Sequence, residues 1–125
     1  MKQIISTSNA PQAIGPYSQA VEANGFVFIS GQIPINPSNG QIPEGIEAQT
    51  EQVMRNIGAI LEAAGLTYAN VVKTTVLLQS IVDFATMNGI YAKYFTADCP
   101  ARAAFEVSAL PKGALIEVEV IAAKN

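Results

Sequence analysis

The sequence predicts one α+β domain spanning residues 1–125, in which a mixed β-sheet of about six strands carries two helices on one face. Short apolar runs with strand periodicity are interrupted by two segments with helical periodicity, which gives the order β-β-β-α-β-α-β-β. An Asn-Gly pair marks a hairpin, and 125 residues are enough for one core. If both helical crossovers leave the sheet on the same side, its other face stays bare.

The N-terminal part of the chain is predicted to form three strands and a loop. Residues 2–7 form a short strand and residues 9–16 the loop. The apolar runs 17–22 and 26–32 flank Asn24-Gly25, which favours a type I′ turn because both residues tolerate positive φ.

This hairpin places Gln19 opposite Ser30 and Tyr17 opposite Gln32. Tyr17 and Ser30 are then diagonal neighbours on one face, roughly 7 Å apart. They are either an ordinary surface pair or part of a site.

The middle of the chain is predicted to form a loop, a long helix and a buried strand. Residues 34–43 are rich in turn residues. Apolar residues recur at helical spacing from 46 to 64, and Gly65 is placed to end this helix. The β-branched and aliphatic run 71–78 is typical of a strand covered on both faces.

A second helix is predicted after Asp83, which is a good N-cap residue. Its apolar face consists of Phe84, Met87, Tyr91, Tyr94 and Phe95. Asn88 and Gly89 are poor residues for a helix interior, where glycine costs about 1 kcal/mol relative to alanine. They indicate a functional or close-packing requirement, or else an exposed polar turn.

The last two strands are predicted at 103–108 and 115–122. Arg102 follows Pro100 among small and apolar residues, and a guanidinium, which is always charged, needs an anionic partner there. That partner is either the carboxylate of a small acid or one of the ten acidic residues of the chain. Glu117 and Glu119 share one strand face, and each is either solvated or functional.

The composition excludes several function classes. Charged residues make up 14% of the chain and hydrophobic residues 50%, whereas about 25% charged is usual, which indicates an oligomer that buries part of its surface. A net charge of −3, with scattered lysines and arginines, argues against nucleic-acid and membrane surfaces.

The chain also lacks several of the residues and motifs that commonly bind metals or nucleotide cofactors. The chain has no histidine, a single cysteine, and neither a P-loop nor a GxGxxG motif, so we expect no metal site and no nucleotide cofactor. Without a signal peptide or a bilayer-length apolar run, the expected location is cytoplasmic.

Six segments together form a specific pattern: Ile14-Gly-Pro-Tyr-Ser18, Ser30-Gly-Gln-Ile-Pro34, Val72-Lys-Thr-Thr75, Asn88 with Tyr91, Pro100-Ala-Arg102 and Ile116-Glu-Val-Glu119. In these segments the chain resembles the RidA (YjgF) family nearly from end to end. The resemblance implies a homotrimer of chorismate-mutase-like subunits with a cleft at each subunit interface. It also implies hydrolytic deamination, without a cofactor, of reactive 2-imino acids and their enamine tautomers to 2-keto acids and ammonia. The substrates of this class are 2-aminoacrylate/2-iminopropanoate and 2-iminobutanoate.

The resemblance also assigns residues. Arg102 matches the arginine that binds the substrate carboxylate, and Glu117 matches the glutamate that orients or activates water. The residues that match the cleft lining are Tyr17, Ser30, Gly31 and Asn88. Ala104 departs from the pattern, since many members carry cysteine there, and this leaves the pocket wall and the substrate preference open. Cys99 is expected to be a packing residue.

Two other functions stay open at this point. The same cleft could capture a keto or amino acid without turnover, as a regulatory module. A structural or chaperone-like trimer, or an RNA-directed activity, is the other alternative, and the acidic balance of the chain disfavours RNA.

Overall fold

The computed structural model describes all 125 residues and has the predicted order of helices and strands. The strands and helices are β1 (Gln3–Ile5), β2 (Ala20–Ala23), β3 (Phe26–Gln32), α1 (Ile46–Ala63), β4 (Val71–Leu78), α2 (Phe84–Tyr91), β5 (Ala101–Glu106) and β6 (Ile116–Ala123). Three short 3-10 helices, η1 (Tyr68–Asn70), η2 (Ile81–Asp83) and η3 (Pro111–Gly113), lie in the connections. The sheet order is β1-β2-β3-β6-β4-β5. Only β4 and β5 pair in parallel, so the sheet is mixed.

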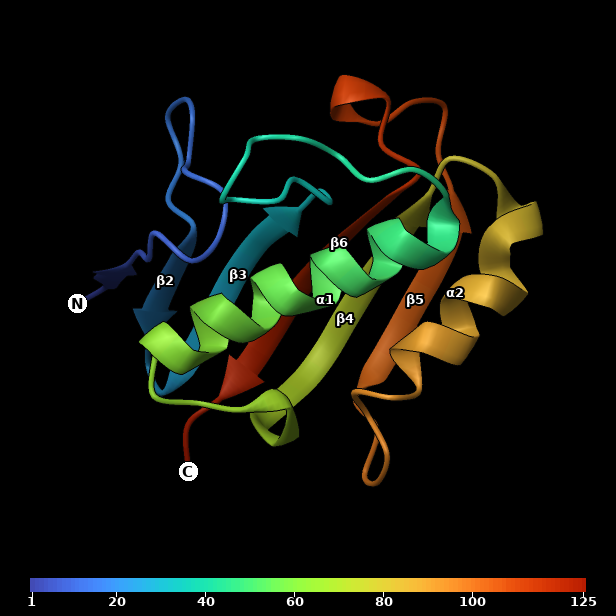
Figure 1. The fold of residues 1–125 in the computed structure, drawn as a ribbon. Coiled ribbons are helices and arrows are strands. Elements are labelled where there is room, and N and C mark those ends of the chain that lie inside the picture. Colours follow the sequence, from blue (N-terminus) through green and yellow to red (C-terminus); the bar gives the residue numbers. More distant parts are fainter.

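Both helices cover the same face of this sheet, as predicted (Figure 1). The core lies between them and the sheet. Val53, Ile57 and Leu61 of α1 are fully buried there, against strand residues such as Val76 and Val118. No helix is both long and apolar enough to cross a bilayer.

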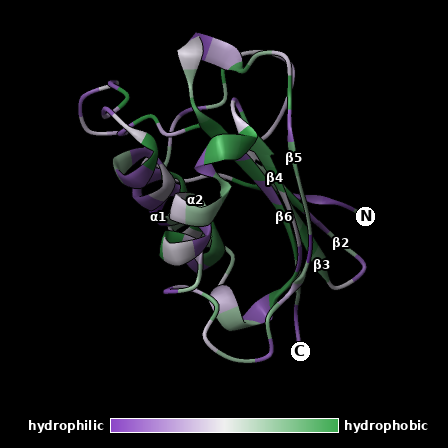
Figure 2. Ribbon diagram, turned by 90° about the vertical axis from the view of Figure 1, so that its right-hand side faces the viewer, coloured by the Kyte–Doolittle hydropathy of each residue, from purple (hydrophilic) through white to green (hydrophobic).

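The opposite face of the sheet carries no helix (Figure 2). Strand alternation points Phe28 and Phe105 toward this face, because their neighbours Val27 and Ala104 pack into the core. Phe28 is 45% exposed and Phe105 48% exposed. The predicted bare face is therefore present, and large aromatic side chains are about half exposed on it.

The hairpin at Asn24-Gly25 is confirmed, with φ of 53° and 81° and with Ala23 opposite Phe26.

The predicted strand 17–22 is wrong at its start, because β2 begins at Ala20. The Gln19 side chain explains the difference. It is 4% exposed, accepts from the Thr7 amide at 2.7 Å and donates to the carbonyls of residues 7, 10 and 11. These bonds hold the chain before Gln19 in a loop instead of a strand.

The two helix ends differ in how well the sequence predicts them. Gly65, with φ of 77°, ends α1 as expected, and the Gly65 and Leu66 amides close a Schellman motif. Asp83 occupies the N-cap position of α2, as predicted, but its side chain makes no capping bond. η2 precedes α2, and it is Ser80 whose side chain accepts from the Val82 amide. α2 also ends at Tyr91, earlier than predicted, although the following turn still buries Phe95.

We expect Gly58→Ala in α1 to lower the free energy of unfolding by about 1–3 kcal/mol. A Cβ at this position would overlap the Tyr68 hydroxyl, which donates to the Met54 carbonyl at 2.6 Å. The matched control is Gly89→Ala in α2, where an added Cβ meets no atom within 4 Å; alanine should raise that free energy by about 0.5–1 kcal/mol. Chemical denaturation measures both, and equal effects of the two substitutions would contradict the predicted overlap.

Candidate functional site

Arg102 lies on the helix-covered face of the sheet, where β5 runs beside α2. Its Nη1 donates to Asn88 Oδ1 at 2.6 Å. The guanidinium carbon is 4.8 Å from the centre of the Tyr91 ring and 5.3 Å from that of Phe84. The two ion pairs of the chain, Lys93–Glu51 and Lys124–Glu22, do not involve it. The alternative that an internal carboxylate neutralises Arg102 is therefore wrong.

A cavity of about 400 Å³ opens beside this guanidinium. Its lining consists of Asn88, Tyr91, Ala92, Phe95, Cys99, Pro100 and Arg102. Cys99, expected to be a packing residue, is exposed and lines the cavity, with its Sγ 3.4 Å from the Phe95 carbonyl. An unpaired cation beside a hollow of this size can accept a small anion.

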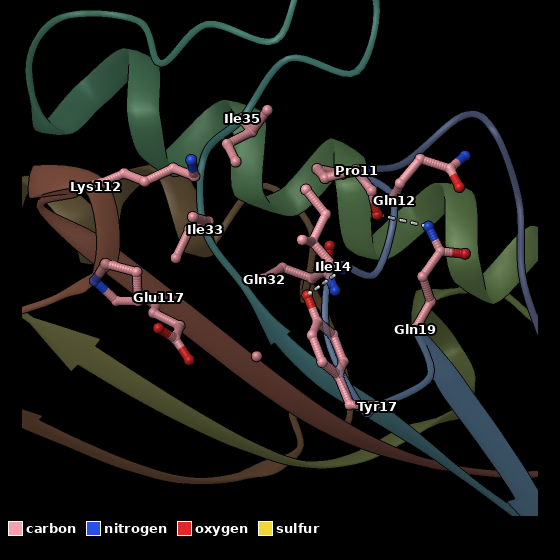
Figure 3. A pocket seen from close by; sticks show the side chains of 12 residues that line it. Pro11, Gln12, Ile14, Tyr17, Gln19, Gln32, Ile33, Ile35, Lys112 and Glu117 are labelled. Atoms are coloured by element: carbon pink, nitrogen blue, oxygen red, sulfur yellow. Dashed lines mark hydrogen bonds between the residues drawn. The ribbon is translucent and has the colours of Figure 1, made fainter.

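Glu117 lies on the opposite, helix-free face, because its neighbours Ile116 and Val118 are buried in the core. It lines a second cavity, of about 450 Å³. Tyr17, Gly31 and Lys112 line the same cavity, together with apolar residues of the 11–14 and 33–35 segments (Figure 3). Tyr17 reaches it from the loop before β2, where its hydroxyl oxygen lies 3.4 Å from the Ile14 amide.

The Glu117 carboxylate packs directly on Gly31 of β3. A Cβ on Gly31 would overlap this carboxylate, so only glycine leaves room for it. Partial burial raises the pKa of Glu117, and the neighbouring charge of Glu119 raises it further. A carboxyl group with this environment exchanges protons closer to neutral pH than an exposed glutamate does.

The predicted site residues therefore fall into two groups within one chain. Asn88 and Arg102 line one cavity, and Tyr17, Gly31 and Glu117 line the other, on the opposite face of the sheet. Ser30 lines neither. Its Oγ donates to the Ser18 carbonyl at 2.6 Å, next to Gly31. The sequence prediction that Tyr17 and Ser30 are diagonal neighbours on one face of a hairpin is wrong for Tyr17, which precedes the strand.

Three residues close to Arg102 or Glu117 were not among the predicted site residues: Phe84, whose ring faces the Arg102 guanidinium, and Tyr91 and Lys112, which line the cavities. Phe84 and Tyr91 share one face of α2 with Asn88, and the spacing i, i+4, i+7 would have indicated this. Lys112 follows a proline in η3 with φ of 57°, and no sequence pattern connects it with Glu117. The chain brings no three His, Cys, Asp or Glu side chains together as metal ligands.

We expect Glu119→Gln to lower the pKa of Glu117, because it removes a like charge that disfavours the ionised carboxyl group. A ¹³C NMR titration of the Glu117 carboxyl carbon should show the midpoint at lower pH than in the wild type. Glu22→Gln in β2 is the control, since Glu22 pairs with Lys124, which follows the far end of β6 from Glu117, and should leave the midpoint in place. An unchanged midpoint in Glu119→Gln would show that burial alone raises this pKa.

Known proteins are similar to this chain over nearly its whole length. A model of the family described as endoribonuclease L-PSP matches residues 7–124. A RutC family protein of Pyrococcus horikoshii is 58% identical over 126 residues, which cover all of both chains. The human protein named 2-iminobutanoate/2-iminopropanoate deaminase is 53% identical over 98% of this chain and 90% of its own. The crystal structure of YyfA, a Rid family protein of Yersinia pestis, matches with a TM-score of 0.96 and 54% identity, covering 98% of this chain and 99% of that one.

Proposed function

Since this chain belongs to the YjgF/RutC/RidA family, as its sequence segments predict, we propose that it hydrolyses reactive 2-imino acids to 2-keto acids and ammonia. The substrates are 2-iminopropanoate, 2-iminobutanoate and their enamine tautomers, the class to which the name of the human relative refers. The observation that carries the proposal is a guanidinium without an internal carboxylate partner, beside a hollow of suitable size.

Arg102 binds the carboxylate of the substrate in this proposal. A planar guanidinium matches a carboxylate with two parallel hydrogen bonds, which fixes the orientation of the ligand as well as its position. One Nη of Arg102 is already bonded to Asn88, and the remaining donors are free for the ligand. The C=N carbon of the imine is bonded directly to this carboxylate, so the same contact fixes the reacting atom.

Glu117 acts on the water. It takes a proton from a water molecule, the oxygen adds to the C=N carbon, and the protonated imine nitrogen receives the electron pair. The same carboxyl group then returns this proton to the nitrogen of the resulting carbinolamine. The C–N bond breaks, the C=O bond forms, and the departing ammonia takes up the hydroxyl proton and leaves as ammonium. A carboxyl group whose pKa is raised by burial is suited to both transfers.

We propose further that each complete site lies between two subunits of a homotrimer. Within one chain Arg102 and Glu117 belong to cavities on opposite faces of the sheet, so a second copy is needed to bring such a pair together. The helix-free face, with Phe28 and Phe105 about half exposed, offers the apolar surface for that contact. The cytoplasmic location and the absence of nucleic-acid and membrane partners stay predictions.

We expect Arg102→Ala to lower kcat/KM about a hundredfold or more, because it removes a charged partner of the substrate carboxylate. Arg102→Lys is the matched control: it keeps the charge but loses the planar fork, and we expect a smaller loss. A serine or threonine dehydratase generates the imine in the assay, and the decay of the imine and the release of ammonia are followed.

The outcomes of this assay distinguish the deaminase from the regulatory module. Acceleration by the wild type that is lost in a folded Arg102→Ala protein supports the deaminase. Binding of 2-oxobutanoate without any acceleration would indicate the regulatory module instead. Near wild-type deamination by Arg102→Ala would contradict the proposed role of this arginine in binding the substrate carboxylate.

We expect inactive Arg102→Ala and Glu117→Gln chains to regain activity when they are unfolded, mixed and refolded together. In a ring of randomly mixed chains about a quarter of the interfaces combine an intact Arg102 from one chain with an intact Glu117 from the next. Each variant taken alone through the same procedure is the control. Mixed oligomers that stay inactive would contradict a site shared between subunits.

A further inference from the structure

Two aromatic rings and one amide of α2 surround the Arg102 guanidinium. The Tyr91 and Phe84 ring centres are 4.8 Å and 5.3 Å from its central carbon, and the Asn88 amide oxygen accepts one of its N–H groups. All three side chains come from one face of α2, at positions i, i+4 and i+7. No carboxylate takes part in this arrangement.

The Tyr91 ring is fixed by the core behind it. Tyr91 is 7% exposed, and its hydroxyl lies 2.8 Å from Thr74 Oγ1, which is itself buried. Its ring packs on Phe95, with the centres 4.8 Å apart. Thr74 is also the residue of β4 that pairs with Arg102 in the parallel register. The side-chain bond and the strand pairing therefore both connect Arg102 to the same point of the core.

We propose that Tyr91 and Phe84 are positioning residues, which hold the Arg102 guanidinium over their ring faces so that its free N–H donors are oriented before an anionic ligand arrives. This inference rests on the proposed function for the identity of the ligand, a small 2-keto or 2-imino acid. Rings attract a guanidinium without neutralising its charge. Arg102 is therefore held in place and still able to bind a carboxylate, which an acidic partner would prevent.

The test uses the fact that Arg55 and Arg102 are the only arginines of the chain. The ¹H–¹⁵N NMR spectrum then has two Nε–H signals, and Arg102→Lys identifies the signal of Arg102. We expect a rigid Arg102 Nε–H in the wild type, measured by its heteronuclear NOE. Tyr91→Leu and Phe84→Leu should make it mobile and raise the Kd of 2-oxobutanoate, measured by calorimetry, about fivefold each.

Two further variants separate positioning from a general effect on the fold. Tyr91→Phe keeps the ring and should restore both the rigid Nε–H signal and the Kd. Tyr94→Leu removes an equally large ring that packs on Tyr68, not on Arg102, and should change neither. Phe84 is only half-buried, so Phe84→Leu still tests the proposal if Tyr91→Leu does not fold.

The proposal fails if Arg102 Nε–H stays rigid in both leucine variants, or if Tyr91→Phe is as damaging as Tyr91→Leu. It also fails if this group is already mobile in the wild type. If the wild type had no deaminase activity, the proposed function would fail but the positioning role would still be tested, because the NMR measurement needs no substrate.

Discussion

The contact between Arg102 and α2 is the interaction on which the candidate site depends. An arginine on a strand among alanines usually finds a carboxylate, and a pair of that kind neutralises its charge. Here an amide oxygen and two aromatic rings take that place. These partners are neutral, so they orient the guanidinium and leave its charge in place. α2 can supply them because Phe84, Asn88 and Tyr91 fall on one of its faces, while Met87 and Ile90 turn into the core.

The two faces of the sheet differ, and this difference connects the candidate site with the proposed association of subunits. Both helices lie on one face, which completes the core but leaves Phe28, Phe105 and Glu117 on the other. A chain with only 14% charged residues cannot cover that face with charge. In the proposed trimer the same contact that covers the apolar face brings the Glu117 cavity of one subunit to the Arg102 cavity of the next, so stability and catalysis depend on one interface.

Local patterns in the sequence predict local structure well. The Asn24-Gly25 turn, the end of α1 at Gly65 and the alternation along β6 all follow from short-range rules, and all are present. The start of β2 was predicted wrongly because one long-range set of hydrogen bonds, made by the Gln19 side chain, overrides strand propensity. Sequence patterns also do not predict that Arg102 and Glu117 lie on opposite faces of the sheet. It depends on how β5 and β6 are placed around β4, which strand periodicity does not determine.

In the proposed reaction, the environment of Glu117 determines when its carboxylate can act as the base. Burial and the charge of Glu119 both disfavour its ionised form. A protonated imine carries a positive charge, and the electrostatic attraction between it and a carboxylate is stronger in a partly buried cavity than in water. In the proposed reaction, binding of the protonated imine therefore lowers the pKa that burial had raised, and the carboxylate forms next to the substrate. Gly31 leaves room for the carboxylate in this position, because a Cβ there would overlap it and displace it from the backbone of β3.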